Sequence, residues 1–224
     1  VIDQMAENKF ITEEEVAEAK KQPLGVNIRS SGGTVFAAEY FTEEVRREIV
    51  ARYGEEALYE GGLSVRTTLD PKLQVMARAA LHRGLIKFDE QQGYRGPYKT
   101  IDVSGDWGKA LGDVENYYDL PEWKLATVLD ITEEGIALGM QPGREASGAL
   151  VEDREQIKLT PEGFKWAMTL RIEDKRTKAK SFGDVFKVGD VVFVEKLEEG
   201  GWRLRQFPAV SAALVAMDPH TGRV

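Results

Sequence analysis

The chain has 224 residues, of which 42% are hydrophobic and 30% are charged, and these shares are ordinary for a folded globular protein. Its formal net charge of -8 argues against nucleic-acid binding by the whole chain, although a local basic face stays possible. The lack of cysteine excludes disulfides, thiol catalysis and cysteine metal sites. The two histidines, His82 and His220, give little support to a histidine-rich metal site or a Ser-His relay. No apolar run approaches the ~20 residues that span a bilayer. We therefore expect any membrane anchor or export signal to lie outside this sequence.

Residues 1–34 are predicted to form a helical tail followed by a linker. The first residues have the character of a helix end, and Thr12 and Glu15 have the spacing of a capping box. This pattern predicts a short helix that stops before Pro23. Residues 24–34 are rich in serine and glycine without periodicity, which indicates a linker and a domain boundary.

Residues 35–92 are predicted to contain a helix, a strand and a second helix. Thr42 is a candidate N-cap, and apolar residues recur at a spacing of four until Gly54, which is expected to end the helix. The alternation in residues 63–69 predicts a strand. Asp70, followed by proline, is the expected N-cap of the next helix. The apolar stripe of that helix comprises Leu73, Ala77, Ala80 and Leu81.

Residues 93–208 have the pattern of a small β-barrel. Short alternating stretches are separated by turns, and residues 198–201 are predicted to form a hairpin turn. Regularly spaced short strands around glycine turns favour an OB-like barrel with one longer excursion. The expected strands cover residues 123–131, 136–140, 164–170, 191–197 and 202–207, with a turn at 132–135.

Residues 209–224 are predicted to begin a sheet. Residues 210–217 are apolar on both faces, which suits a strand in the middle of a sheet, and residues 218–222 supply turn chemistry. A buried strand needs neighbours on both sides and a covering layer. We therefore expect the rest of this sheet to lie outside the chain.

Several stretches together resemble one bacterial family. Residues 40–47 (YFTEEVRR), 53–63 (YGEEALYEGGL) and 67–74 (TTLDPKLQ) are similar to the junction region of class A penicillin-binding proteins, the bifunctional enzymes of cell-wall synthesis. Residues 213–222 (ALVAMDPHTG) resemble the first strand and turn of the transpeptidase domain, and residues 10–24 resemble the end of the glycosyltransferase domain. The resemblance implies a central fragment that carries an OB-like insert.

The residues that the family's chemistry needs are not supplied. Transpeptidase acylation requires a serine with a lysine three positions later, and no serine here has one. The Lys-Thr-Gly motif is also absent, and His220, Thr221 and Gly222 are predicted to form an ordinary turn. Glu152 and Asp153 match the residue pair of the glycosyltransferase motif, but Gln156 stands where the family has phenylalanine, so we predict a charged loop.

An OB-type binding module is the alternative function. Three tryptophans could stack nucleic-acid bases or sugars, although such side chains more often fill a core. A basic run could contact phosphate, nucleic acid or an anionic glycan, although its adjacent acids favour a solvated loop. The alternative requires the tryptophans and the basic run to share one exposed face. These residues are Trp123, Trp166 and Trp202, and Arg171, Lys175, Arg176, Lys178 and Lys180 beside Glu173 and Asp174.

The sequence therefore predicts a mixed α+β fold without catalytic, cofactor-binding or metal-binding residues. Its domains are residues 1–34, the helical tail and linker; 35–92, the junction; 93–208, the OB-like insert; and 209–224, the start of the transpeptidase sheet. The resemblance implies a noncatalytic segment that positions catalytic domains and offers a docking surface, with the adjoining domains, peptidoglycan and a regulatory protein as partners and no nucleic acid. It also implies a periplasmic location in a protein anchored in the inner membrane by sequence outside this chain.

Overall fold

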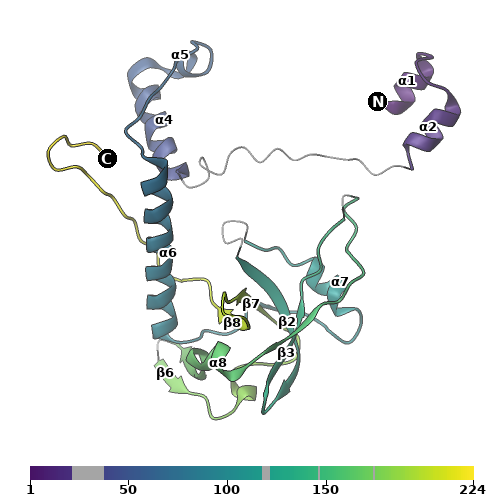
Figure 1. The fold of residues 1–224 in the computed structure, drawn as a ribbon, viewed down its shortest axis with the longest axis vertical. Coiled ribbons are helices and arrows are strands. Elements are labelled where there is room, and N and C mark those ends of the chain that lie inside the picture. The colour runs from purple at the N-terminus through teal and green to yellow at the C-terminus, as the bar shows by residue number, and fades with distance from the viewer. Residues whose placement is uncertain (22–37, 118–121, 146, 174) are drawn as a thin grey trace. The chain divides into compact units, whose positions relative to one another are not determined.

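The computed structural model describes residues 1–21, 38–117, 122–145, 147–173 and 175–224 (Figure 1). The chain forms two compact units. One combines Val1–Ile28 with Gly93–Arg205, and the other combines Arg29–Gln92 with Gln206–Val224. The chain thus leaves the second unit after Gln92 and returns to it at Gln206. The linker predicted at residues 24–34 lies outside the described residues.

Two short helices, α1 (Ile2–Glu7) and α2 (Glu13–Ala19), are formed by the first residues. The predicted capping box is confirmed. The Thr12 hydroxyl accepts a hydrogen bond from the Glu15 backbone N–H at 3.3 Å, and the Glu15 carboxylate accepts one from the Thr12 N–H at 2.7 Å. The box satisfies two backbone donors that would otherwise lack partners at the start of α2.

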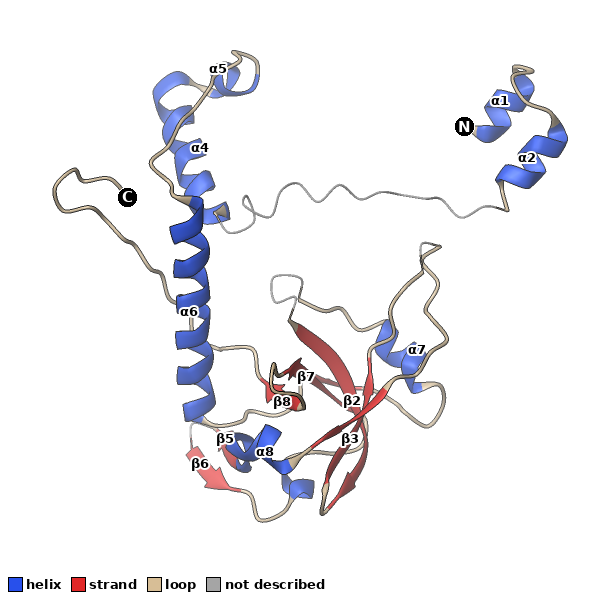
Figure 2. Ribbon diagram, viewed as in Figure 1, coloured by secondary structure: helices blue, strands red, loops and turns tan. Residues whose placement is uncertain are grey.

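Three helices belong to the second unit, namely α4 (Glu39–Tyr53), α5 (Glu55–Tyr59) and α6 (Pro71–Gln92) (Figure 2). The N-cap predicted at Thr42 is wrong, because α4 begins earlier and the Thr42 N–H already donates to Ala38 O at 2.8 Å. The predicted stop at Gly54 is confirmed, and its φ of 84° is a conformation that glycine adopts without a side-chain clash.

Helix α6 begins as predicted but runs further than its apolar stripe. The Asp70 carboxylate accepts hydrogen bonds from the backbone N–H groups of Lys72 and Leu73 at 2.8 and 3.2 Å. The helix continues to Gln92, so His82 lies in its interior. Leu73 is 62% exposed, so this end of the predicted stripe is not covered within the described residues.

Neither of the two strands predicted outside the barrel forms. Residues 63–69 and 210–217 pair with no other described strand, and Val65 and Val215 are 45% and 73% exposed. An alternating or apolar pattern makes a strand only where a second strand completes the backbone hydrogen bonds. The turn after residue 217 does form, with the Gly222 N–H donating to Asp218 O at 2.8 Å.

The barrel unit is built on one antiparallel sheet (Figures 1 and 2). Its strand order is β1-β7-β2-β3-β4, and β8 also pairs with β7. Strand β7 lies between β2 on one side and both β1 and β8 on the other. The predicted hairpin turn at 198–201 joins β7 to β8, as Leu197 N donates to Gly201 O at 3.1 Å. The strands are β1 (Lys99–Thr100), β2 (Trp123–Thr132), β3 (Gly135–Met140), β4 (Gln156–Leu159), β7 (Asp190–Lys196) and β8 (Trp202–Arg205).

Both faces of the central strands are buried. Val128 and Val192 point into the main core, where Phe164 packs edge-on against Phe186 with ring centroids 5.2 Å apart. Leu125 is fully buried outside that cluster. The short helix α7 (Trp107–Gly112) packs against β2 and β3, which explains burial on this second face. The mixed α+β class with an OB-like barrel is confirmed.

One predicted barrel strand is largely helical. Thr160 is the N-cap of α8 (Pro161–Phe164), and the 3-10 helix η1 (Lys165–Met168) follows directly. A proline at the first helical turn favours a helix start, and this local signal outweighs the β character of residues 164–168. The chain becomes extended at β5 (Thr169–Ile172), which pairs with β6 (Lys175–Lys178) in a separate two-stranded sheet. A second 3-10 helix, η2 (Phe182–Asp184), follows.

Candidate functional site

A buried carboxylate on α6 holds the segment that follows the barrel. Asp89 is 2% exposed, and its two oxygens accept hydrogen bonds from Gln206 Nε2 at 2.7 Å and from the Ala209 backbone N–H at 3.1 Å. A buried carboxylate is tolerated only when such donors replace water. Gln206 and Ala209 follow the barrel, whereas Asp89 precedes it. The two chain segments that border residues 93–205 are thereby held together.

The barrel begins with a glycine whose conformation is required by its surroundings. Gly93 has a φ of +106°, and a Cβ atom at this position would lie 2.7 Å from Thr169 O. The next residue, Tyr94, pairs with β5: its N–H donates to Thr169 O, and its carbonyl accepts from the Arg171 N–H, both at 2.8 Å. The first residues of the barrel are thus fixed against its β5–β6 excursion.

Tyr94 fills the main core but leaves its hydroxyl without a partner. The ring is 2% exposed and packs edge-on against Trp166, with centroids 5.8 Å apart. The buried hydroxyl has no hydrogen-bond partner among the described residues. Burial raises the pKa of this hydroxyl, and the charge of Asp190 adds to the effect. Tyr94 therefore acts as a neutral packing residue.

Helix α7 is held at its N-terminus by an ion pair. Asp106 caps the helix by accepting from the Gly108 N–H at 3.0 Å, and both carboxylate oxygens receive Arg154, at 3.0 Å from Nε and 2.9 Å from an η nitrogen. Such two-point pairing fixes geometry as well as charge. The Arg154 guanidinium lowers the pKa of Asp106 from 3.8 to about 2.

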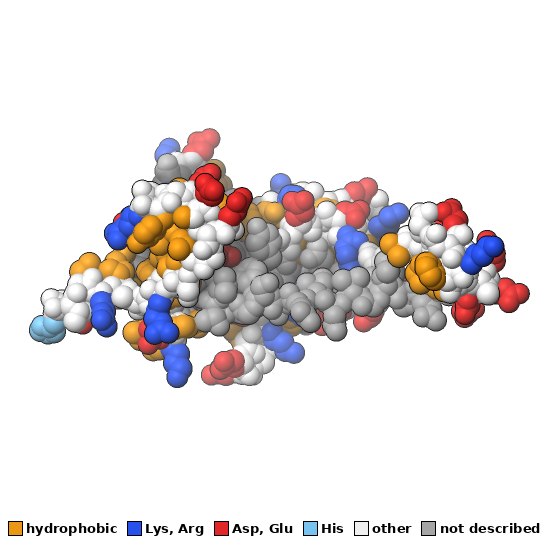
Figure 3. All heavy atoms as spheres, turned by 90° about the horizontal axis from the view of Figure 1, so that it is seen from above, with side chains coloured by type: hydrophobic (Ala, Val, Ile, Leu, Met, Phe, Trp, Pro, Cys, Tyr) orange, Lys and Arg blue, Asp and Glu red, His pale blue; other side chains and the backbone are white. Residues whose placement is uncertain are grey.

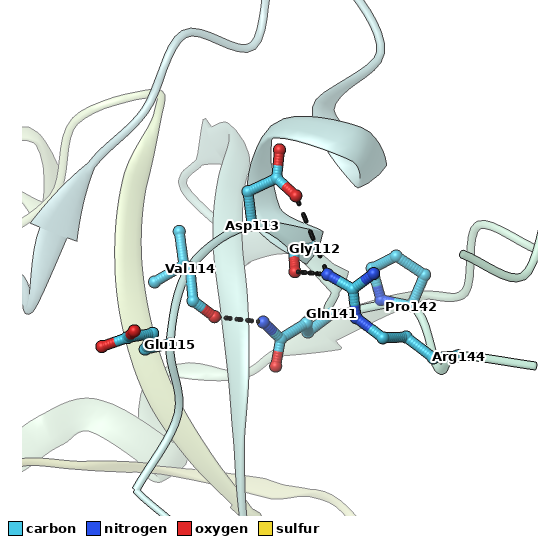
Figure 4. A pocket seen from close by; sticks show the side chains of 7 residues that line it. All are labelled: Gly112, Asp113, Val114, Glu115, Gln141, Pro142 and Arg144. Atoms are coloured by element: carbon cyan, nitrogen blue, oxygen red, sulfur yellow. Dashed lines mark hydrogen bonds and ion pairs between the residues drawn. The ribbon is translucent and has the colours of Figure 1, made fainter. Parts of the chain in front are cut away.

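Polar side chains from the segment after β3 hold the C-terminus of α7 (Figure 4). Gln141 Nε2 donates to the carbonyls of Leu111 and Val114 at 2.9 and 2.8 Å, and Arg144 donates to Gly112 O at 2.9 Å. The last carbonyls of a helix lack partners within the helix, and these side chains supply them. The groups border a hollow of about 400 Å³ lined by Gly112, Asp113, Val114, Glu115, Gln141, Pro142 and Arg144.

The polar side chains that line this hollow have structural roles. Gln141 and Arg144 are engaged by backbone carbonyls, and Arg144 also lies 3.7 Å from the Asp113 carboxylate. A nucleophile beside a base, which acyl transfer requires, is not among its lining residues. We therefore assign these side chains to the attachment of α7 to the sheet.

Comparison with known proteins places this barrel in a family. Residues 94–210, just over half of the chain, match the family described as the penicillin-binding protein OB-like domain. The chain belongs to the penicillin-binding proteins. The matched residues cover the whole sheet together with α7, α8 and the β5–β6 hairpin.

Similar proteins include several penicillin-binding proteins 1A. That of Rickettsia prowazekii (strain Madrid E) is 34% identical over 225 residues, which cover this whole chain and 26% of the relative. That of Escherichia coli (strain K12) is 27% identical over 231 residues, or 25% of its length. The crystal structure of penicillin-binding protein 1A from Haemophilus influenzae matches 93% of this chain and 27% of that one, with 27% identity and a TM-score of 0.58.

The predicted resemblance to class A penicillin-binding proteins is confirmed by these matches. The chain spans about a quarter of the length of the relatives that it matches. Among the described residues, no helix has both the length and the apolar character needed to cross a bilayer.

The tryptophans of this penicillin-binding protein segment do not form the platform that the alternative function requires. Trp123 is only 4% exposed, and the Trp166 indole N–H donates to Leu204 O at 3.2 Å. Trp202 packs partly buried against the main core. The basic run lies instead on the exposed strand β6 and its neighbours. The tryptophans and the basic run therefore do not share one exposed face.

Residues resembling pieces of catalytic motifs lie in a loop and a turn. Glu152 and Asp153 are exposed in the loop before β4, and the neighbouring Arg154 is occupied by Asp106. At residues 218–222, the Asp218 carboxylate accepts from the His220 N–H at 2.9 Å and from the Thr221 hydroxyl at 2.6 Å. These contacts build a turn, as predicted.

Sequence reasoning missed both Asp89 and the attachment of α7. Asp89 stands eight residues after Leu81, a multiple of the four-residue spacing of the predicted apolar stripe. A charged residue at a position that continues an apolar stripe is the sequence signal that could have revealed the burial of Asp89. For α7, the signal was Asp106, a preferred N-cap residue placed two residues before Gly108.

Proposed function

We propose that this chain is a noncatalytic segment of a bifunctional peptidoglycan synthase, which combines a glycosyltransferase with a penicillin-binding DD-transpeptidase. The segment positions the two catalytic domains and offers a docking surface to partner proteins. Similarity to penicillin-binding proteins 1A along the whole chain supports this proposal. The Asp89 contact is the observation that carries it, because it ties the two chain segments that border the barrel to one helix.

Exposed apolar side chains support the proposed contact with adjoining domains. Leu73 and Met76 on α6 are 62% and 65% exposed, and Val215 and Met217 are 73% and 60% exposed. Hydrophobic side chains lie at the surface among charged ones in Figure 3. Exposed apolar residues gathered on one segment are typical of surfaces that another protein part covers. In the whole protein, the adjoining domains cover them.

The proposed location follows from the same function. Peptidoglycan is the substrate of the whole protein, so the segment lies in the bacterial periplasm. The inner-membrane anchor belongs to sequence outside this chain. No cofactor or metal is assigned to the segment.

The noncatalytic role is tested by labelling with a fluorescent penicillin. We expect the chain itself to show an unchanged intact mass after incubation, whereas the whole protein gains one penicillin. A stable covalent adduct on the chain would overturn the noncatalytic assignment.

The positioning role is tested in the whole protein with Asp89→Ala. If Asp89 fixes the arrangement of the domains, the variant loses crosslinking of newly made glycan strands but keeps its acylation rate with soluble penicillin. Asp153→Ala removes an exposed carboxylate and is the matched control. Equal losses of crosslinking and acylation, or no loss of either, would count against positioning.

A further inference from the structure

Helix α6 has apolar side chains on two opposite sides. On one side, Leu81 and Leu85 are partly buried within the chain. On the other side, Leu73 and Met76 are 62% and 65% exposed. A helix with one side in water needs a single apolar stripe, whereas a helix that is apolar all round is typical of a protein core. The exposed side of α6 therefore has the character of a surface that another element covers.

The exposed side is a continuous row of residues, which we call the α6 stripe. Its members are separated by three or four positions, so they lie on one face of the helix. Rows of residues four positions apart are the ridges by which two helices pack against each other. The last four members make one such ridge, about three turns long. The stripe consists of Leu73, Met76, Ala80, Gly84 and Phe88, which are all exposed.

The middle of the stripe is small, whereas its ends are bulky. A Cβ atom at Gly84 would meet no described atom within 4 Å, so no neighbour within the chain requires glycine there. Glycine inside a helix is also less stable than alanine. Ala80 lies one turn before Gly84, and Phe88, one turn after it, is 49% exposed. Small side chains at the contact let two helices approach closely, so the stripe fits a second helix.

Basic residues follow one edge of the stripe. Seven positions are about two turns, so Arg83 lies on the side of Met76, and Lys87 lies on the side of Ala80. Lys72 is four positions before Met76 and continues the same edge. All three basic side chains are exposed. They are complementary to an acidic partner, and they disfavour a second copy of α6, because like charges would then meet.

We propose that the α6 stripe docks an amphipathic helix of the adjoining domains, whose acidic residues pair with Lys72, Arg83 and Lys87. The apolar side of that helix lies over Ala80 and Gly84. This inference rests on the proposed function, in which adjoining domains cover α6, and adds the kind of element that covers it and its charge. The chain spans 26% of the length of a relative that it matches, so most of such a protein lies outside the chain.

The first test compares Gly84→Leu in the chain alone and in the whole protein. In the chain, the leucine enters open space and favours the helix, so Tm should stay unchanged or rise. In the whole protein, the leucine holds the docked helix away, so Tm should fall by a few degrees. Gly84→Ala is the matched control and should be tolerated in both. Equal effects of Gly84→Leu in the chain and in the whole protein would overturn the inference.

The second test measures binding of the full chain to a fluorescent helical peptide that has leucine along one face and glutamate along its edge. Anisotropy should show saturable binding that weakens with added salt. The double variant Arg83→Glu and Lys87→Glu should weaken binding by about tenfold. The matched control reverses Lys124 and Lys196, which are exposed on the barrel strands β2 and β7, and should leave binding unchanged.

Two further peptides separate charge from helical shape. A peptide with lysine in place of glutamate should bind more weakly, because its charges meet the basic edge of the stripe. A peptide with a central proline cannot form a continuous helix, so it should also bind more weakly. No binding, equal binding of all three peptides, or equal losses in the two charge-reversed variants would overturn the inference. Self-association of the chain that Gly84→Leu abolishes would assign the stripe to a second copy instead.

A negative result here is separate from failure of the proposed function. Positioning is read from crosslinking by Asp89→Ala, and noncatalytic character is read from penicillin labelling. If both of those expectations hold while Gly84→Leu is tolerated in the whole protein, the docking inference alone is overturned.

Discussion

Asp89 and Gln206 are separated by 117 positions, yet Gln206 Nε2 lies 2.7 Å from a carboxylate oxygen of Asp89. The barrel residues stand between them in the sequence. The second oxygen of the same carboxylate receives the Ala209 N–H. One buried side chain thus contacts both borders of the barrel, and its loss removes a hydrogen-bond acceptor from the buried Gln206 amide and from the Ala209 N–H.

Replacement of Asp89 by alanine should destabilise the unit that contains α6. Hydrogen bonds to charged groups contribute about 1.5–3 kcal/mol to folding, and we expect a loss in that range in the free energy of unfolding. Urea denaturation measures the loss, and hydrogen exchange at the Ala209 amide locates it. Asp153→Ala should change neither quantity. Unchanged protection of Ala209 in Asp89→Ala would contradict the assigned contact.

Gly93→Ala should destabilise the barrel more than Gly96→Ala does. Both glycines have positive φ, +106° and +113°, but only at Gly93 would the new Cβ approach a backbone oxygen, Thr169 O at 2.7 Å. At Gly96, a Cβ would meet no atom within 4 Å. Gly96→Ala therefore measures the cost of placing alanine at positive φ, about 1–3 kcal/mol of unfolding free energy. The additional loss in Gly93→Ala measures the clash of the new Cβ with Thr169 O. Equal urea midpoints for the two variants would show that the clash is absent.

The Asp106–Arg154 pair should make stability depend on pH in a defined window. The pKa of Asp106 is lowered from 3.8 to about 2 in the folded chain, because Arg154 favours the ionised carboxylate. A lowered pKa stabilises the fold above the unfolded value, and this stability is lost as pH falls from about 4 toward 2. Arg154→Gln should therefore reduce Tm above this window and have a diminishing effect within it.

Gln141→Met is the control for this pH series. Gln141 Nε2 donates to the carbonyls of Leu111 and Val114 at the other end of α7, and a carbonyl does not titrate in this range. Its effect on Tm should therefore vary less with pH than that of Arg154→Gln. Parallel pH profiles for the two variants would contradict the role of Asp106.

Tyr94→Phe should be neutral or should stabilise the barrel by up to about 1 kcal/mol, because it removes a buried hydroxyl that has no partner among the described residues while keeping the ring. Thr127→Val should behave alike, since the Thr127 hydroxyl is also buried with no partner in the described part of the chain. Thr100→Val is the contrast, as its hydroxyl donates to Asp190 at 3.4 Å. Urea midpoints compare the three. A clear loss of stability in Tyr94→Phe would indicate that the hydroxyl is hydrogen-bonded in solution.

Most local signals in the sequence were reliable where the structure depends on neighbouring residues, and the N-cap predicted at Thr42 is the exception among those discussed. The Thr12 and Glu15 capping box, the Asp70 cap, the helix end at Gly54 and the hairpin turn at 198–201 all form as predicted. Each of these features is decided by hydrogen bonds or φ angles within a few residues. Sequence spacing therefore contains the necessary information.

Strands that depend on distant partners were predicted less well. Residues 63–69 have a clear alternation, and residues 210–217 are apolar, yet neither forms a strand, because no described segment completes its hydrogen bonds. By contrast, β2 and β7 were predicted closely, since each has a partner on both sides within the chain. In residues 164–168, a local helix start at Thr160 overrode the strand pattern.

By itself, the sequence determined the mixed α+β class, the helix caps at Thr12 and Asp70, the helix end at Gly54, the turns at 198–201 and 218–222, and the resemblance to class A penicillin-binding proteins. The tertiary structure alone decided that Trp123 and Trp166 belong to buried packing, that α7 is held at both ends by side chains distant in sequence, and that Asp89 joins the borders of the barrel. These facts depend on which groups lose contact with water when the chain folds. Burial is set by the meeting of segments more than a hundred residues apart, as with Asp89 and Gln206, and no local spacing encodes that meeting.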